Sequence, residues 1–112
     1  MNYSIIIPCF NEVNTIEEII FKVKNFNDLN TEIIVVDDCS TDGTREKLVN
    51  ELKLSIDTLI LNKQNFGKGY SLRKGIEKAN GNIILFQDAD LEYAPSEYSL
   101  LLKPIVENKA DV

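Results

Sequence analysis

Four short apolar runs, separated by longer segments with helical periodicity, limit what this chain can fold into. The runs cover residues 3–8, 32–36, 56–61 and 83–86 and are rich in isoleucine, valine and leucine. Runs this short are typical of buried strands, and apolar residues at helical spacing between them are typical of covering helices. A chain that alternates strands and helices forms right-handed crossovers and a parallel sheet with helices on both faces. The sequence therefore predicts one α/β unit over residues 1–112.

Composition and charge exclude several classes of function. Of the 112 residues, 44% are hydrophobic, which is enough for one buried core. The net charge of -6 provides no general attraction to nucleic acid or to anionic lipid. The chain has no histidine, so His-based triads and His-rich zinc sites are excluded, and any general base must be an aspartate or a glutamate.

The two cysteines and the length of the apolar runs bear on the cellular compartment. Cys9 and Cys39 are too few and too far apart for a zinc cluster or a disulfide framework, which predicts free thiols in a reducing compartment. No apolar run approaches the roughly 20 residues of a membrane span. We therefore expect a cytoplasmic location and no membrane span in this segment.

Polar residues gather where each predicted strand ends. They are Asn11-Glu12 after the first run, Asp37-Asp38 after the second, residues 62–69 after the third, and residues 88–90 after the fourth. In parallel sheets, ligands bind in the crevice outside the carboxyl ends of the strands. The intervening helical segments carry an ordinary amphipathic pattern. This segregation predicts a ligand site at that edge of the sheet.

Asp88 and Asp90 stand one residue apart directly after the last apolar run. Side chains two residues apart on extended backbone point the same way, so the two carboxylates repel unless a cation lies between them. Carboxylate oxygens suit Mg²⁺ or Mn²⁺, with waters and substrate phosphates completing the coordination. Single Asp-x-Asp triplets are commonly solvated loops or helix caps, but the other strand-end residues favour a metal site that holds a diphosphate.

Two further segments are candidates for nucleotide contacts. An acidic residue after the second strand of such a sheet often accepts a hydrogen bond from a ribose hydroxyl or a base, which makes Asp37 and Asp38 candidates. The competing interpretation is that one of them caps the next helix. Gly67-Lys68-Gly69 matches neither the P-loop nor the G-x-G-x-x-G spacing, although a helix start beside a lysine can attract an anion. A plain turn into a surface helix is the alternative there.

Four ordered motifs span almost the whole chain. They read S-I-I-I-P-C-F-N-E, I-V-V-D-D-C-S-T-D-G-T, N-F-G-K-G-Y-S-L-R-K-G-I and F-Q-D-A-D-L-E-Y-A-P. Together they resemble the nucleotide-sugar half of family 2 glycosyltransferases with the GT-A fold, and Q-D-A-D-L with its following proline is closer to dolichol-phosphate mannosyltransferase-like members. The resemblance implies a Rossmann-like half of a GT-A domain whose acceptor half is absent from residues 1–112.

The resemblance also implies a nucleotide-sugar site that draws on all four motifs. Its residues are Pro8, Asn11, Glu12, Asp37, Asp38, Lys68, Asp88, Ala89 and Asp90. Glu12 matches a position near the ribose or base, Asp38 matches the residue that reads the base, and Lys68 a position near the phosphates. Asp88 and Asp90 match the two acids of the D-x-D motif, with Asp90 as the metal-binding second acid.

The implied reaction is metal-assisted, inverting transfer of a sugar from a GDP-mannose or UDP-glucose type of donor to a polyprenyl phosphate or glycan acceptor. A bound Mg²⁺ or Mn²⁺ would neutralise the leaving nucleoside diphosphate. No residue matches the acceptor half, so no catalytic base is assigned, and residues 110–112 resemble the start of another strand. We therefore expect a fragment that binds donor weakly, turns over little, and self-associates through an exposed sheet edge. Membrane association is expected only of the full-length protein.

Three other classes of protein are alternatives. A nucleotidyltransferase would show a Gly-rich, Arg/Lys-bearing loop after the first strand, where this chain has P-C-F-N-E. A receiver-type signalling domain would place its acidic pair after the first strand and its phospho-acceptor aspartate after the third, which here ends in Leu61-Asn62. A catalytically silent nucleotide-binding or scaffold fragment stays open.

Overall fold

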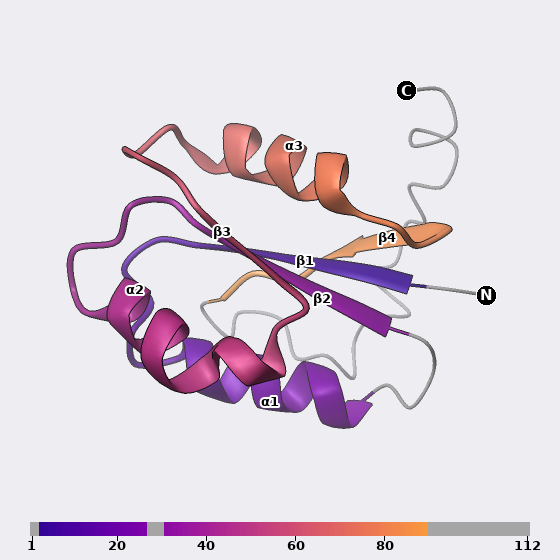
Figure 1. Ribbon diagram of the computed structural model, residues 1–112, viewed down its shortest axis with the longest axis horizontal. Coiled ribbons are helices and arrows are strands. Elements are labelled where there is room, and N and C mark those ends of the chain that lie inside the picture. The colour runs from indigo at the N-terminus through magenta and orange to yellow at the C-terminus, as the bar shows by residue number, and fades with distance from the viewer. Residues whose placement is uncertain (1–2, 27–30, 90–112) are drawn as a thin grey trace.

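The computed structural model of the chain describes residues 3–26 and 31–89. Its elements follow one another as β1 (Tyr3–Cys9), α1 (Ile16–Phe26), β2 (Thr31–Asp37), α2 (Thr44–Lys47), η1 (Leu48–Leu52), η2 (Lys53–Ser55), β3 (Thr58–Leu61), α3 (Lys68–Lys78) and β4 (Ile83–Phe86). The four strands form one parallel sheet in the order β3-β2-β1-β4 (Figure 1). The predicted α/β alternation is confirmed. Asp90 and the predicted strand at 110–112 lie outside the described residues.

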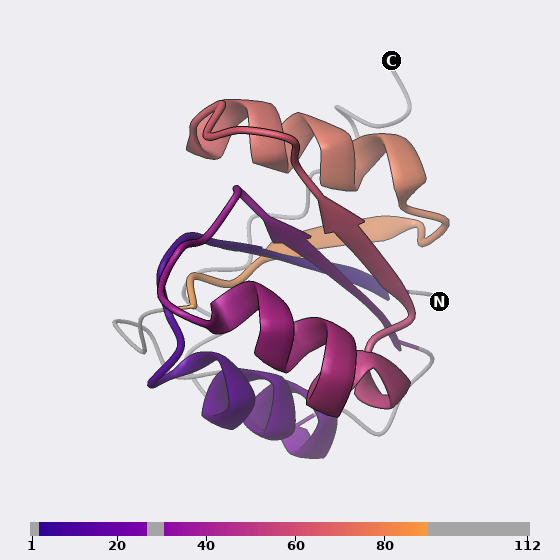
Figure 2. The same ribbon diagram turned by 60° about the vertical axis from the view of Figure 1, so that its left-hand side comes forward.

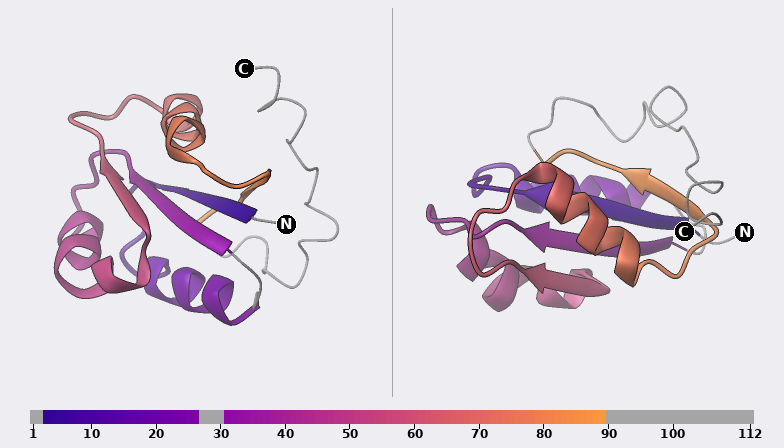
Figure 3. Two further views of the ribbon diagram at one scale, coloured as in Figure 1. Left: turned by 45° about the vertical axis from the view of Figure 1, so that its right-hand side comes forward. Right: turned by 90° about the horizontal axis from the view of Figure 1, so that it is seen from above.

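Helices cover both faces of the sheet, as the isoleucine-rich strands require. Ile5 and Ile7 of β1 face α1 and the turn η1, in a core cluster that also holds Ile19. Ile6, between them in sequence, faces the opposite side, where Ile76 of α3 packs. Figures 2 and 3 show α3 on one face and α1 with α2 on the other. A central strand with covered faces needs apolar residues at consecutive positions, which explains the Ile5-Ile6-Ile7 run.

The first strand does not end at Pro8, as the sequence suggested, but continues through Cys9. The Cys9 carbonyl accepts from the Asp38 amide on the β2 side, and the Ile6 carbonyl accepts from the Gln87 amide on the β4 side. Backbone groups of successive residues alternate between the two neighbours, so Pro8 faces the β4 side. Pairing with β4 ends at Ile6, and the missing N–H of Pro8 therefore costs no bond of the sheet.

A smaller difference concerns the second crossover, between β2 and β3, and the start of β3. The strand predicted from residue 56 begins at Thr58, and residues 56 and 57 connect it to η2, which ends at Ser55. None of the helices in residues 3–26 and 31–89 is long and apolar enough to cross a membrane.

Candidate functional site

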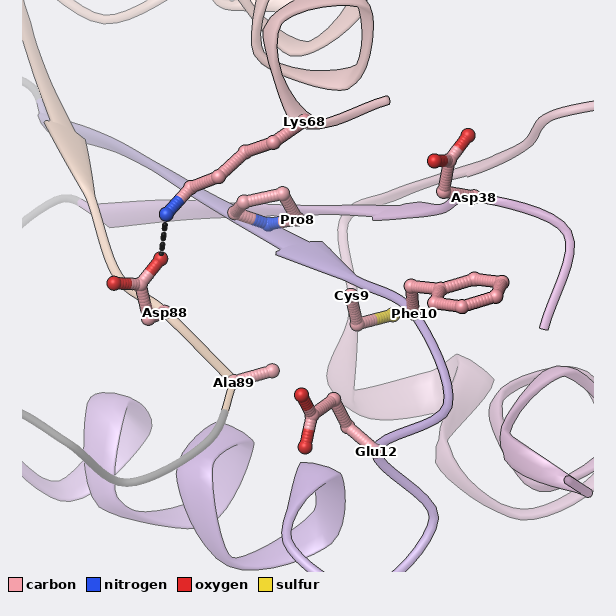
Figure 4. A pocket seen from close by; sticks show the side chains of 8 residues that line it. All are labelled: Pro8, Cys9, Phe10, Glu12, Asp38, Lys68, Asp88 and Ala89. Atoms are coloured by element: carbon pink, nitrogen blue, oxygen red, sulfur yellow. Dashed lines mark hydrogen bonds and ion pairs between the residues drawn. The ribbon is translucent and has the colours of Figure 1, made fainter. Parts of the chain in front are cut away.

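A pocket of about 240 Å³ opens at the carboxyl end of the sheet, where β1, β2 and β4 end and α3 begins (Figure 4). The residues that line it are Pro8, Cys9, Phe10, Glu12, Asp38, Lys68, Asp88 and Ala89. Six of these belong to the nine residues singled out from the sequence. Asn11 and Asp37 do not line the pocket, and Asp90 is outside the described residues. Cys9 and Phe10 were missed, although they stand between two predicted positions of the same loop.

Asp38 ties the end of β2 to the loop that leads into α3. Its side chain, 5% exposed, accepts hydrogen bonds from the amides of Phe66 and Gly67 and from the Asn62 side chain, each at 2.9 Å. Charge-assisted bonds of this kind are stronger than neutral ones. The carboxylate therefore sets the path of the loop and the position of Lys68, which begins α3 directly after Gly67.

Asp37 is completely buried and acts within the protein. Its carboxylate accepts from the Ser40 hydroxyl at 2.6 Å and the Ser40 amide at 3.1 Å, and the Arg45 guanidinium lies 3.9 Å away. Neither Asp37 nor Asp38 caps α2, because the N-cap position is Gly43 and the two carboxylates bind Ser40 and the loop at residues 62–67 instead. The suggestion that one of the strand-end pair caps the next helix is therefore wrong.

Asn11 joins the loops after β1 and β2. It adopts a left-handed backbone with φ of 55°, and its side-chain oxygen accepts from the Thr41 amide at 2.7 Å. Its own amide donates to the Ser40 hydroxyl, which in turn donates to Asp37. The structure thus makes Asn11 a support of the pocket wall, whereas the neighbouring Glu12 lines the pocket.

The Cys9 thiol is not a nucleophile in this setting. Burial raises its pKa far above the ordinary value, and the neighbouring Asp37 carboxylate, which accepts from the sulfur at 3.7 Å, raises it further. The thiol therefore stays protonated at neutral pH and serves as a small apolar wall of the pocket.

Asp88 contributes the carboxylate that can take a cation in the pocket. It follows β4 by two residues, and its Oδ1 atom contacts the ammonium group of Lys68. No group of three or more His, Cys, Asp or Glu side chains within residues 3–26 and 31–89 is arranged to hold a metal ion. A divalent cation at Asp88 would therefore depend on further oxygen ligands, of which the sequence predicts Asp90.

Thr15 is a residue of the site that sequence analysis missed. It lies just before α1, and its hydroxyl donates a hydrogen bond to the Ala89 carbonyl at 2.5 Å. The two residues are 74 positions apart in the sequence. The bond ties the acidic loop after β4 to the start of α1. Only the fold brings these two residues together, and no local sequence pattern indicates the contact.

Thr15→Val is expected to loosen the acidic loop with little effect on packing, since valine has the shape of threonine without its hydroxyl. Loss of one such bond costs about 1 kcal/mol. We expect a small drop in the free energy of unfolding and faster amide exchange at residues 88 and 89. Thr15→Ser keeps the hydroxyl and should retain the slow exchange. Equal exchange rates in the two variants would show that the bond does not hold the loop.

The chain is similar to known proteins over almost its whole length. The model of the glycosyl transferase family 2 matches residues 4–112. A dolichol-phosphate mannosyltransferase of Pyrococcus furiosus is 33% identical over 114 residues, which cover 100% of this chain and 32% of that protein.

Two solved structures are similar as well. Mannosyltransferase PcManGT from Pyrobaculum calidifontis, in complex with GDP-Man and Mn²⁺, gives a TM-score of 0.74 at 28% identity over 90% of this chain and 30% of that one. Staphylococcus aureus TarS in complex with UDP-GlcNAc gives 0.68 at 29% identity over 80% and 27%. The chain spans about a third of the length of these relatives.

Proposed function

This chain belongs to glycosyl transferase family 2, and we propose that it forms the nucleotide-sugar-binding part of a glycosyltransferase. Its parallel sheet with helices on both faces matches the Rossmann-like GT-A fold of the similar structures. The observation that carries the proposal is the pocket at the carboxyl ends of the strands. It joins residues of four separate motifs in the place where such sheets bind ligands.

In this proposal Asp38 and Glu12 contact the nucleoside. A carboxylate offers about four acceptor positions, and the three bonds to the loop at residues 62–67 leave Asp38 capacity for a base N–H. Glu12 lines the same pocket from the loop after β1 and would accept from a ribose hydroxyl or the base. Support for nucleotide binding comes from the relatives, of which one was solved with GDP-Man and another with UDP-GlcNAc.

Lys68 and Asp88 provide the opposite charges that a metal-bound diphosphate requires. The Lys68 ammonium would bind phosphate oxygens, and Asp88, with Asp90, would hold Mg²⁺ or Mn²⁺. The residues fit this use, because Asp88 already takes a cationic group from the pocket side. When bound, the divalent cation would neutralise charge on the leaving nucleoside diphosphate.

The finer features of the reaction are proposed on the same basis. The donor is of the GDP-mannose or UDP-glucose type, the acceptor is a lipid phosphate or a saccharide, and transfer is inverting and cytoplasmic. We assign no catalytic base among residues 1–112. A polyprenyl phosphate acceptor is already anionic and would need none.

Calorimetric titration of the protein with GDP, UDP and GDP-mannose, with and without Mn²⁺, tests the proposal. We expect binding that requires Mn²⁺ and is lost in Asp90→Ala, and the preferred base then identifies the donor class. Absence of binding to the folded protein would contradict the proposal and favour a silent scaffold, as would binding that is indifferent to both Mn²⁺ and Asp90.

A further inference from the structure

Lys68 and Asp88 form an ion pair across the pocket, although they belong to segments on different sides of it. Lys68 is the first residue of α3, whereas Asp88 follows β4. The Nζ–Oδ1 distance is 2.5 Å, and the side chains are 61% and 27% exposed (Figure 4). The pair thus lies at the open side of the pocket, within reach of a ligand.

This pair distinguishes Asp88 from the other aspartate that lines the pocket. The Asp38 carboxylate is held by three donors from the loop at residues 62–67 and is nearly buried. Within residues 3–26 and 31–89, the Asp88 carboxylate is instead paired with the Lys68 ammonium group, whose side chain is 61% exposed. A divalent ion at Asp88 would have to share the carboxylate with the Lys68 ammonium, and two cations at one carboxylate repel each other. Lys68 and a bare metal ion therefore compete.

We propose that Lys68 is an exchangeable counter-ion that makes metal binding at Asp88 depend on the nucleotide; this inference rests on the proposed function. Without nucleotide, Lys68 neutralises Asp88 and opposes a bare divalent cation. When a nucleoside diphosphate binds, the Lys68 ammonium moves to the phosphate oxygens and releases Asp88 to the metal.

The side chain is suited to this exchange. Lysine carries its charge on a flexible four-carbon stem, so it can turn from one oxygen to another without a change in the backbone. An exposed ion pair of this kind changes an equilibrium constant by no more than about fivefold, so it is readily broken. The anchor of Lys68 stays fixed meanwhile, because the preceding Gly67 amide is bound to Asp38.

The exchange couples the two ligands in both directions. Any factor by which nucleotide raises the metal affinity is also the factor by which metal raises the nucleotide affinity. Lys68 contributes to this factor twice, since it weakens the binding of metal alone and strengthens the binding of the diphosphate. Removing its charge should therefore move the two affinities in opposite directions.

The test is to measure Mn²⁺ binding from the paramagnetic resonance signal of the free ion, in wild type and Lys68→Met, without nucleotide and with saturating GDP or UDP. In Lys68→Met we expect bare Mn²⁺ to bind about threefold more tightly. In the same variant we expect the Mn²⁺-bound nucleotide to bind about tenfold more weakly, because a charge-assisted contact to phosphate is lost.

Lys74→Met is the matched control. It removes the same charge from the same helix, but the Lys74 ammonium lies over the Tyr70 ring, 5.4 Å from its centroid, and Lys74 does not line the pocket. Both affinities should stay at their wild-type values. In Lys68→Met the affinity for bare Mn²⁺ should rise while the affinity for Mn²⁺-bound nucleotide falls. General loss of structure would lower both affinities, so it cannot explain this result.

Two outcomes would overturn the inference, and they are distinguishable. If wild type shows Mn²⁺-dependent nucleotide binding but Lys68→Met binds bare Mn²⁺ no more tightly, the counter-ion role is wrong and the proposed function stands. If the folded wild type shows no Mn²⁺-dependent nucleotide binding at all, the proposed function fails and this inference fails with it.

Discussion

Asp38→Asn should cost about 2–3 kcal/mol of the free energy of unfolding and abolish nucleotide binding, although the two side chains have nearly the same shape. The amide group keeps one acceptor oxygen and replaces the other with a donor. One of the three hydrogen bonds to Asp38 then becomes a contact between two donors, for example at the Gly67 amide, and the negative charge that strengthens the remaining two is lost. Urea unfolding and calorimetric titration with nucleotide measure the two effects.

Asp42→Asn is the control for this substitution. Asp42 also binds backbone amides, those of Val13 and Thr44, but it is exposed and does not line the pocket. We expect it to cost about 1 kcal/mol or less, the usual net contribution of an exposed hydrogen bond, and to keep nucleotide binding. If the two variants lose equal free energy of unfolding, the bonds from the loop at residues 62–67 to Asp38 stabilise the protein no more than the exposed bonds of Asp42.

Gly81→Ala should be the other strongly destabilising change. A Cβ atom on Gly81 would lie 2.7 Å from the Ser4 amide nitrogen and 2.8 Å from the Tyr3 carbonyl carbon. These are backbone atoms of β1, the strand between β2 and β4, so no rotamer change relieves the contact. Overpacking of this kind costs about 1–3 kcal/mol, and here it also pushes β4 and the acidic loop that follows it away from β1.

Gly69→Ala tests whether the cost at Gly81 comes from the close approach. The nearest atom to a Cβ on Gly69 is Arg73 Nη1 at 3.9 Å, an ordinary contact, and Gly69 lies in α3. Alanine favours a helix over glycine by up to about 1 kcal/mol. Urea unfolding should therefore show Gly69→Ala at or above wild-type stability and Gly81→Ala well below it. Equal stability of the two variants would contradict the packing that the structure shows.

Much of the fold follows from the sequence because both faces of the sheet are covered. A residue such as Ile6 has an apolar neighbour on each side in sequence, and 0% of it is exposed. A short run that is apolar at every position is typical of a strand whose two faces are both buried. The strands, and the helices between them, could therefore be predicted. The position of the pocket could also be predicted. Parallel strands bring their carboxyl ends to one edge of the sheet, and ligands bind outside that edge.

The separate roles of Asp37 and Asp38 could not be predicted from residue patterns, and only the family resemblance singled out Asp38. Asp37 and Asp38 are identical in type and adjacent, but neighbouring side chains on extended backbone point to opposite sides. One carboxylate therefore turns into the protein and the other toward the pocket, and only the sheet's orientation decides which. The turn of Asn11 toward Thr41 and the bond from Thr15 to Ala89 join residues far apart in the chain, at positions that no periodic pattern marks.

Amide chemical-shift mapping during titration with GDP or UDP and Mg²⁺ tests the central claim most directly, because the molecule offers a second groove for comparison. That groove lies between β3 and α3 and is lined in part by Lys63, Tyr70 and Lys78. We predict that the shifts concentrate at Phe10, Glu12, Asp38, Lys68, Asp88 and Ala89, and that Mn²⁺ in place of Mg²⁺ broadens signals around Asp88 first. Shifts confined to the second groove, or none in a folded protein, would contradict the assignment of the nucleotide site to the carboxyl end of the sheet.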